Sequence, residues 1–343
     1  MKDSIKVGVI GLGFMGRAHV AHYENIANAR VVAVADADPN RRQGEADVVG
    51  NIAVPLPRLD VSRYQVFADG RDLIEKADVD LVDICLPTYL HAEFAVAAAN
   101  AGKHVIVEKP MALSSVEAER MIATARAKKV ELMVAHCLRF WPEYVYLKEL
   151  IDTKRFGKLI KAEFVRRSSK PVWTWQGWMS DAKRSGGAML DLHIHDVDYV
   201  NYVLGRPTCL YARAIPTEAT GGYDLVTSQY SYQGGPEITL DAAWYQVGSF
   251  GFRAAFLAVF ERALVHMDSS AQPSMHLHQL DGSQPQAIEL QGDAYFSELE
   301  FMVKCLLAGK SPASVIPPES AKQSIELVEA ERRSSETGQV LSF

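Results

Sequence analysis

Two clusters of side chains in this chain are suited to acid–base chemistry. The first is Glu108-Lys109-Pro110, which directly follows the apolar run 103–107. If that run is a strand of a parallel sheet, Lys109 lies at the carboxyl edge, where such sheets bind ligands. There an ammonium group could polarise a substrate oxygen or pass a proton. A solvated surface lysine is the alternative interpretation.

The second cluster lies in the segment 185–198, Ser-Gly-Gly-Ala-Met-Leu-Asp-Leu-His-Ile-His-Asp-Val-Asp. Read as a helix, it places Asp191, His195 and Asp198 on one face, at spacings of four and three. His195 then suits a general base that a carboxylate orients, because a neutral imidazole can accept an alcohol proton near pH 7. A capped helix with a hydrogen-bonded histidine is the structural alternative.

A strand would give the same segment a different meaning. His193 and His195 would then share one face and resemble a pair of metal ligands. Apolar residues at helical spacing continue through Leu204, and Gly205 is a natural helix C-cap, so the helix is favoured and no metal site is expected. His276 and His278 have no acid or cysteine at ligand spacing, and we expect both at the surface.

A glycine-rich turn near the start of the chain is suited to binding a dinucleotide. The apolar run 5–10 is followed by Gly11-Leu12-Gly13-Phe14-Met15-Gly16. The first glycine permits a tight turn, the second lets backbone amides approach a pyrophosphate, and the third lets the helix that starts at Phe14 pack close to the strand. The phosphates would lie at the N-terminus of that helix. A purely structural glycine turn is the alternative.

An acidic residue strengthens the dinucleotide interpretation. A second apolar run, 31–35, ends in Asp36, which lies 20 residues beyond Gly16, the spacing at which a carboxylate binds an adenosine ribose. A carboxylate there repels a 2′-phosphate, so NAD is favoured over NADP. Arg41 and Arg42 are near enough in sequence to keep NADP possible.

Strands that alternate with helices position these groups in the first part of the chain. Further apolar strands are expected at 80–86, 103–107 and 131–135, with helices between them. Ser114 and Glu117 form a capping box, and Gly102 is a C-cap. This alternation predicts a parallel sheet wound on both faces. The polar stretch 38–64 shows little periodicity and gives no clear assignment.

The pattern changes after residue 136, which predicts one domain over 1–136 and a second over 137–343. After a helix at 142–153, most segments alternate apolar with polar residues and predict a large, mostly antiparallel sheet, with turns at Gly234-Gly235 and Asp281-Gly282. The expected strands are 158–167, 208–215, 224–232, 237–245, 250–261 and 274–280. Two helices, 295–308 and 318–336, close the chain.

One of these strands carries large aromatic residues at alternate apolar positions, Phe252, Phe256 and Phe260. They must be buried by helices or by another subunit. We favour a second subunit, which predicts a homo-dimer or homo-tetramer.

Bulk properties exclude several classes of protein. The 343 residues carry a net charge of −6 with both signs interspersed, so nucleic acid is not an expected partner. No apolar run approaches membrane-spanning length, and the first strand begins too early for a signal peptide, so a cytoplasmic enzyme is expected. The four cysteines are scattered, and we expect them to be reduced.

Taken together, these motifs resemble the Gfo/Idh/MocA family, named for glucose-fructose oxidoreductase, inositol dehydrogenase and rhizopine catabolism. The residues that carry the resemblance are the glycine turn, Pro87-Thr88 with His91, Glu108-Lys109-Pro110, and the segment from Gly186-Gly187 to Asp191 and His195. The resemblance covers nearly the whole chain. It differs at Ser185, where a third glycine is often found.

This resemblance implies a Rossmann domain (α/β), then an α+β domain whose open antiparallel sheet serves in oligomerisation, with the active site between the two. Lys109, Asp191 and His195 would be the catalytic set of an NAD-dependent dehydrogenase acting on a sugar or cyclitol. Pro87, Thr88, His91, Glu108 and Pro110 would lie near the cofactor.

Candidate substrate contacts are Arg139 and the aromatic residues Trp173, Trp175 and Trp178, for which packing at the domain junction is the alternative. Two other functions use the same features. One retains NAD for transient oxidation, as in glycoside cleavage or sugar-sugar oxidoreduction. The other is a non-catalytic regulator that binds NAD and a sugar, against which the joint presence of the three catalytic residues argues.

Overall fold

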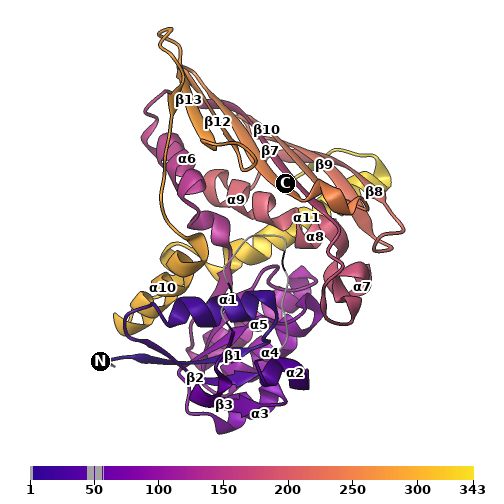
Figure 1. Ribbon diagram of the computed structural model, residues 1–343. Helices are drawn as coiled ribbons and strands as arrows, with labels where there is room; N and C mark the ends of the chain where they lie inside the picture. The colour runs from indigo at the N-terminus through magenta and orange to yellow at the C-terminus, as the bar shows by residue number, and fades with distance from the viewer. Residues whose placement is uncertain (1–2, 45–49, 51–55, 57) are drawn as a thin grey trace. The chain divides into compact units, whose positions relative to one another are not determined.

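A six-stranded parallel sheet, in the order β3-β2-β1-β4-β5-β6, organises the first part of the chain (Figure 1). The computed structural model describes residues 3–44, 50, 56 and 58–343. All neighbouring strands of this sheet are parallel, and the order reverses between β1 and β4. The strands are β1 (Ile5–Ile10), β2 (Ala29–Ala35), β3 (Gln65–Phe67), β4 (Leu81–Ile84), β5 (His104–Glu108) and β6 (Leu132–Ala135). The predicted doubly wound parallel sheet is confirmed.

Helices connect these strands, and local sequence signals set their ends. The helices are α1 (Phe14–Tyr23), α2 (Pro39–Arg42), α3 (Gly70–Lys76), α4 (Thr88–Asn100) and α5 (Ser115–Lys128), with a 3-10 turn η1 (Val61–Arg63). The Ser114 hydroxyl accepts the N–H of Glu117 at 3.3 Å, and Glu117 Oε2 accepts the N–H of Leu113 at 3.1 Å. The Glu117 side chain therefore bonds the N–H of the residue before the N-cap, whereas in the standard capping box it bonds the N–H of the N-cap residue itself. Gly102, just after α4, has φ +73°, as a C-cap glycine should.

The stretch 38–64, which gave no assignment from sequence, contains α2 and η1 and is followed by β3 at the sheet edge. Strand β3 was not predicted, because three residues are too few to show a period. Pro55 and Pro57 lie outside the described residues.

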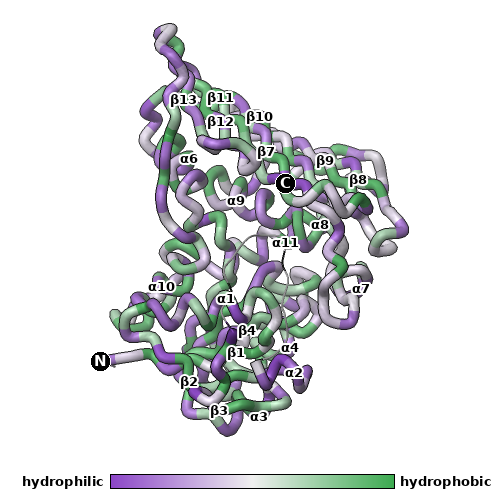
Figure 2. The backbone as a smooth tube through the Cα atoms, viewed as in Figure 1, coloured by the Kyte–Doolittle hydropathy of each residue, from purple (hydrophilic) through white to green (hydrophobic). Residues whose placement is uncertain are grey.

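A nine-stranded sheet organises the second part of the chain, in the order β14-β13-β12-β11-β7-β10-β9-β8-β15. Its pairs are antiparallel except for β10 with β7, which is parallel. The strands are β7 (Leu159–Ser169), β8 (Cys209–Pro216), β9 (Tyr223–Ser231), β10 (Glu237–Tyr245), β11 (Phe252–Phe260), β12 (Ala263–Asp268), β13 (Met275–Gln279), β14 (Gln286–Ala287) and β15 (Leu341–Ser342). Buried and half-buried residues alternate along β11 and β12, and Figure 2 shows both hydrophobic and hydrophilic residues along this sheet.

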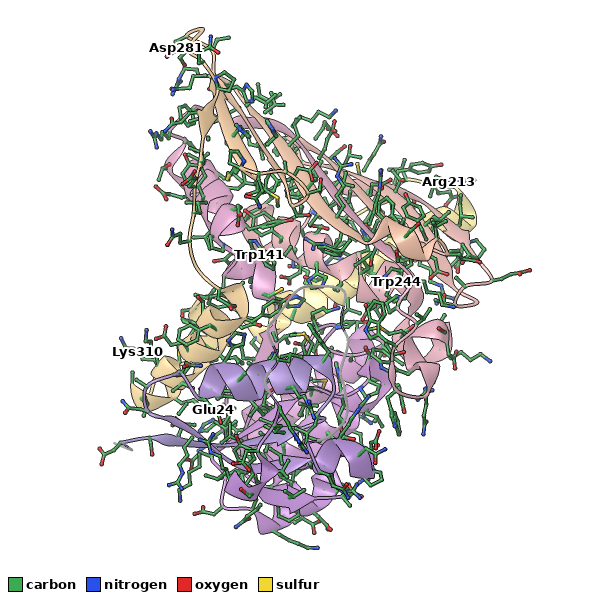
Figure 3. All side chains as sticks on the ribbon, viewed as in Figure 1. Glu24, Trp141, Arg213, Trp244, Asp281 and Lys310 are labelled. Atoms are coloured by element: carbon green, nitrogen blue, oxygen red, sulfur yellow. The ribbon has the colours of Figure 1, made fainter. Side chains whose placement is uncertain are left out.

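The two predicted hairpin turns are confirmed. Gly234-Gly235 joins β9 to β10, and Asp281-Gly282 joins β13 to β14. Figure 3 shows Asp281 at the tip of its hairpin. Strand β12 was not predicted.

The preferred explanation for the aromatic strand was wrong, because helices of the same chain cover it. Phe256 lies 2% exposed, with its ring centroid 5.3 Å from that of Tyr144 on α6 (Pro142–Thr153). Tyr144 in turn packs edge-on against Tyr199 of α9 (Ile194–Leu204) at 4.8 Å. Phe252 joins a cluster around Trp244. Phe256 and Phe260 are therefore buried within the chain itself.

The remaining helices complete the two units. They are α7 (Ala182–Ser185), α8 (Gly187–Asp191), α10 (Ala294–Leu307) and α11 (Pro318–Thr337), with 3-10 turns η2 (Cys137–Arg139), η3 (Trp175–Ser180), η4 (Gly248–Phe250) and η5 (Pro312–Ser314). Each compact unit is assembled from three segments. The first comprises 1–137, 173–178 and 295–322, and the second 138–172, 179–294 and 323–343. The sequence predicted one boundary, between residues 136 and 137, with each domain formed by a single continuous segment. The units of the structure differ from this prediction because the chain passes between them several times.

Within the described part of the chain, no helix is both long and apolar enough to cross a lipid bilayer.

Candidate active and cofactor-binding sites

The glycine turn after β1 has the geometry that a dinucleotide requires. Gly11 has φ +95°, and a Cβ there would lie 2.4 Å from the Cys85 carbonyl oxygen. A Cβ at Gly16 would lie 1.7 Å from the Gly11 oxygen, so only glycine lets α1 start this close to the strand. Among the described residues, a Cβ at Gly13 would meet nothing nearer than Arg41 Nη1 at 3.7 Å. The backbone of Gly13 thus borders open space, as a pyrophosphate site would need.

The first turn of α1 also suits an anion. No side chain caps its N-terminus at Gly13, and the turn, which includes Phe14 and Met15, contains no acidic residue. The N–H groups of this turn and the helix dipole therefore favour a phosphate.

Asp36 lies at the carboxyl end of β2 beside this turn. Its two carboxylate oxygens accept the backbone N–H groups of Leu12 at 2.7 Å and Asp38 at 2.8 Å. Each oxygen has a second lone pair that could accept a ribose hydroxyl. Arg41 Nη1 lies 3.8 Å from Asp36 Oδ2, whereas Arg42 donates to the carbonyl oxygens of Asp36 and Ala37. Of the two arginines, Arg41 is therefore the one placed to meet a 2′-phosphate.

The loop from β4 into α4 holds three more predicted cofactor residues. Pro87 is the N-cap residue of α4, and Thr88 is 1% exposed with a hydroxyl that has no hydrogen-bond partner among the described residues. The ring of His91 faces two carbonyl oxygens, Pro110 at 2.8 Å from Nδ1 and Leu86 at 2.7 Å from Nε2. Burial lowers the pKa of His91, so at neutral pH the ring donates to one carbonyl at a time.

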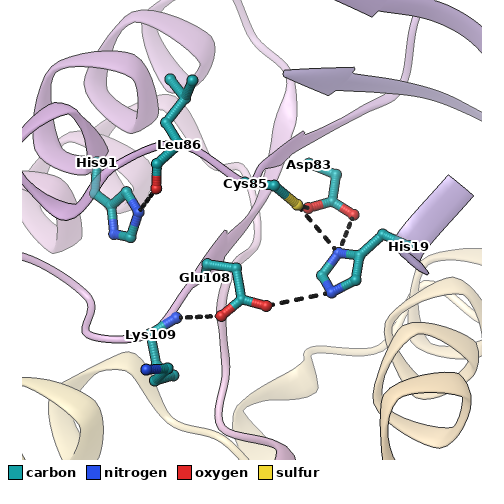
Figure 4. Close-up of polar contacts among 7 residues, drawn as sticks. All are labelled: His19, Asp83, Cys85, Leu86, His91, Glu108 and Lys109. Atoms are coloured by element: carbon teal, nitrogen blue, oxygen red, sulfur yellow. Dashed lines mark hydrogen bonds and ion pairs between the residues drawn. The ribbon is translucent and has the colours of Figure 1, made fainter. Parts of the chain in front are cut away.

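Figure 4 shows a buried cluster behind Lys109 that the sequence analysis missed. His19 Nδ1 lies 2.9 Å from Asp83 Oδ2 and 3.3 Å from the Cys85 sulfur. His19 Nε2 lies 3.3 Å from Glu108 Oε1, an ion pair without good hydrogen-bond alignment. Glu108 Oε2 accepts the backbone N–H of Lys109 at 3.0 Å. His19 lies in the middle of α1, and nothing in the neighbouring sequence indicates that it meets groups from two strands.

The charges in this cluster stabilise one another. Burial alone lowers the pKa of His19, but the charge of Asp83 and its hydrogen bond raise it, and it lies well above its ordinary value. Burial raises the pKa of Glu108, but the ion pair with His19 and the charge of Lys109 bring it below its ordinary value. Burial raises the pKa of Cys85, which stays a thiol. The cluster therefore contains an imidazolium between two carboxylates.

The segment of Asp191 and His195 is not one continuous helix. Asp191 ends α8, His195 lies in the first turn of α9, and the helices are separated at Leu192-His193. Asp191 is buried and His195 half-buried. Leu192 and His193 both keep right-handed helical backbone angles. The break therefore needs no glycine or proline, and the sequence carries no signal for it.

Buried polar contacts anchor α8 and α9. Asp224 Oδ1 accepts the N–H of Ala188 at 3.2 Å and thereby caps α8. His193 pairs with Glu331 at 3.0 Å, away from the face expected for Asp191. Ser185, in place of the third glycine, accepts the N–H of Gly187 at 3.1 Å.

Arg139 and Asp198 form a fully buried ion pair. Arg139 donates to both carboxylate oxygens of Asp198, at 2.9 and 2.7 Å, and its side chain is 0% exposed. Asp198 therefore acts as an anchor for α9 and for Arg139. A substrate contact by Arg139 stays a prediction. Trp173 and Trp175 are half-buried residues near η3.

Within the first unit, the structure brings the predicted cofactor residues together with Lys109. The glycine turn, Asp36, Thr88 and Lys109 follow β1, β2, β4 and β5, whose carboxyl ends lie at one edge of the sheet. Asp191 and His195 lie together in the second unit.

Comparisons with known proteins agree with this geometry. Residues 5–136 match the Gfo/Idh/MocA model described as an oxidoreductase family with an NAD-binding Rossmann fold, and residues 144–265 match the C-terminal domain of the same family. The chain is 25% identical over 348 residues to a myo-inositol 2-dehydrogenase of Thermotoga maritima, covering 97% of this chain and 96% of that protein.

A levoglucosan dehydrogenase of Pseudarthrobacter phenanthrenivorans is 32% identical over 213 residues, covering 60% of this chain and 52% of that protein. A solved structure of levoglucosan dehydrogenase with NADH and levoglucosan has a TM-score of 0.85 at 20% identity, covering 99% of both chains. That likeness supports the fold. With both of its domains matched and the glycine turn in place, the chain belongs to the Gfo/Idh/MocA oxidoreductase family, and its first unit contains the family's NAD-binding Rossmann fold.

Proposed function

We propose that this protein is an NAD-dependent dehydrogenase that oxidises a secondary alcohol of a sugar, cyclitol or sugar derivative. The observation that carries the proposal is the cradle at the edge of the first sheet. There Gly13 borders open space, the first turn of α1 has no capping side chain, and Asp36 presents an anchored carboxylate. A relative that matches over nearly its full length, the myo-inositol 2-dehydrogenase of Thermotoga maritima, supports the substrate class.

The residues present fit NAD. Gly11, Gly13 and Gly16 would hold its pyrophosphate against α1, and Asp36 would accept its ribose hydroxyls. When bound, NAD accepts a hydride from the substrate carbon. Asp36 favours NAD, because a 2′-phosphate would meet its carboxylate. Arg41, 3.8 Å from that carboxylate, is the residue that would favour NADP.

The catalytic roles we propose fall to Lys109, Asp191 and His195. His195 accepts the proton of the substrate hydroxyl as the C–H bond breaks, so the alcohol loses one proton and one hydride to become a ketone. Lys109 donates a hydrogen bond to the substrate oxygen and holds it in place. Asp191 keeps His195 in the orientation that accepts the proton.

A substrate panel tests the proposal. Inositols, aldoses, anhydro sugars and sugar acids are each incubated with the protein and either NAD or NADP, and reduction is followed by absorbance. We expect reduction of NAD with at least one polyol. Lys109→Ala should lower kcat by about a hundredfold or more, the range for loss of an acid–base or positioning group. Its NAD affinity should change little.

Lys128→Ala, an exposed lysine near the end of α5, is the matched control and should keep full activity. Equal activity of Lys109→Ala and the wild type would contradict the role of Lys109. Turnover without stoichiometric release of NADH would instead favour transient oxidation, and silence across the panel would favour a regulator.

We also propose a cytoplasmic location and a homo-oligomer. The scattered free cysteines support a reducing compartment. Half-buried apolar residues on the outer face of the second sheet, among them Leu257 and Leu264, support assembly.

A further inference from the structure

The cluster behind Lys109 is a chain of alternating charges. It runs from Asp83 on β4, through His19 on α1, to Glu108 at the end of β5 and on to Lys109. Asp83 and His19 are 0% exposed, and Glu108 is 8% exposed. Buried charges are costly unless each has a partner, and here each is paired with a neighbour of opposite sign.

Glu108 acts as a bridge between its two neighbours. Its Oε1 lies 3.3 Å from His19 Nε2, and its Oε2 accepts the backbone N–H of Lys109. If the ion pair with His19 is lost, the carboxylate is free to rotate and the N–H of Lys109 loses its acceptor. His91 reaches the Pro110 carbonyl at 2.8 Å from the other side. The backbone at Lys109 is therefore held between two buried histidines.

The placement of His19 between two carboxylates, one in a hydrogen bond and one in an ion pair, favours its positively charged form. Its two ring nitrogens each face a carboxylate, Asp83 at Nδ1 and Glu108 at Nε2. Ionised carboxylates only accept hydrogen bonds, and a neutral imidazole has one N–H. Both contacts are therefore favourable only for the imidazolium.

The other groups that face His19 do not replace this charge. Cys85 lies 3.3 Å from Nδ1 as a neutral thiol. Tyr23 of α1 lies against Asp83, and Glu298 of α10 lies near Tyr23. Lys109 lies near Glu108 on the far side.

We propose that His19 is a positioning residue, which fixes Glu108 and through it Lys109, and so connects the NAD-binding helix α1 to the catalytic end of β5. This inference rests on the proposed role of Lys109. His19 itself touches neither substrate nor cofactor in this role. Because α1 also carries the glycine turn, any shift of the helix is transmitted to Glu108 by the ion pair.

Two substitutions at His19 separate this role from a purely structural one. An asparagine amide can replace Nδ1 and keep the contact with Asp83, whereas a glutamine amide reaches the place of Nε2 and can donate to Glu108. We expect His19→Asn to lower kcat by about 10- to 100-fold, the cost of misplacing a catalytic group by about 1 Å. His19→Gln should lose only a few-fold, and NAD affinity should stay within a few-fold of the wild type in both.

The pH dependence gives a second measurement. His19 lowers the pKa of Glu108, so its loss raises that pKa. The acid limb of the kcat/KM profile should therefore move to higher pH in His19→Asn. In a double-mutant cycle, Glu108→Gln, which keeps an acceptor for the Lys109 N–H, should be strongly non-additive with His19→Asn. Tyr230→Phe removes a buried hydrogen bond to Glu331 in the second unit and is the control for general destabilisation.

A measurement on the protein without substrate tests the role of His19 independently of the proposed dehydrogenase activity. Histidine NMR of the protein should show His19 as imidazolium at pH 7.5. A neutral His19, additive effects in the cycle, or higher activity for His19→Asn than for His19→Gln would each overturn the positioning role. Full activity of Lys109→Ala would instead overturn the proposed function, whatever the charge of His19.

Discussion

At the scale of single residues, the three glycines of the turn differ in what a side chain would meet. At Gly16 a Cβ meets backbone at 1.7 Å, whereas at Gly13 the nearest atom is the end of a flexible arginine at 3.7 Å. Gly16 is thus required by the fold, whereas the described neighbours of Gly13 leave room for a side chain. A bound pyrophosphate would explain the glycine at position 13.

This difference predicts opposite outcomes for two alanine substitutions. Gly16→Ala should lower the melting temperature of the protein, since overpacking costs about 1–3 kcal/mol or more. Gly13→Ala should leave the melting temperature nearly unchanged, because φ −71° suits alanine, and should weaken NAD binding at least about tenfold, or ~1.4 kcal/mol. Thermal unfolding and NAD titration by fluorescence measure the two effects. Tight NAD binding by Gly13→Ala would argue against a pyrophosphate at this turn.

At the scale of elements, Asp224 controls the start of α8 and hence the place of Asp191. Asp224 is 0% exposed and accepts hydrogen bonds from Ala188 N–H, from the Thr217 hydroxyl at 2.6 Å and from the Thr220 hydroxyl at 2.8 Å. The cap therefore joins α8 to the loop before β9.

We predict that Asp224→Ala destabilises the second unit by about 3 kcal/mol, because it removes a helix cap and leaves buried donors without acceptors. Activity should fall with it, since α8 positions Asp191. Asp181→Ala removes the cap of α7, an accessible turn where Asp181 accepts the Lys183 N–H at 2.9 Å. As the matched control it should cost only about 1 kcal/mol in urea unfolding. Equal losses in the two variants would contradict a special role for Asp224.

At the scale of the whole molecule, the outer face of the second sheet is the surface we assign to a second copy of the chain. Leu257, Val259 and Leu264 point away from the helix-covered face, beside three histidines, and all are half-buried. His266 stacks on His276 and lies near His278, with both centroid distances 5.2 Å. We call these six residues the outer patch, defined as Leu257, Val259, Leu264, His266, His276 and His278.

We predict that Leu257→Glu makes the protein monomeric without unfolding it, because a charge in the outer patch would be buried by assembly. Light scattering after size exclusion measures the mass, and Val116→Glu, at an exposed position of α5, is the control.

The histidines of the outer patch predict a pH dependence. Burial, with His278 and His276, lowers the pKa of His266. Stability that depends on neutral His266 is therefore present above its ordinary pKa and is lost as the pH falls through the lowered value. Protonation also adds positive charge to the outer patch, so assembly should weaken as the pH falls through the range in which histidines titrate. A monomer at all pH values would refute this assignment.

The sequence by itself determined the features that depend on neighbours in the chain. The glycine turn, the spacing from Gly16 to Asp36 and the caps at Ser114, Gly102 and Gly205 all take effect within one or two elements. Period-two and period-3.6 patterns likewise predicted most strands and helices. Local geometry suffices for these features, because backbone conformation and capping involve only residues close in sequence.

Only the tertiary structure decided which distant groups meet. His19, Asp83 and Glu108 come from three elements, and Arg139 reaches Asp198 across 59 positions. Sheet register and helix packing set these meetings, and a single sequence does not encode register locally. For the same reason the sequence showed that Phe256 must be buried, whereas only packing revealed that the cover is Tyr144 of its own chain.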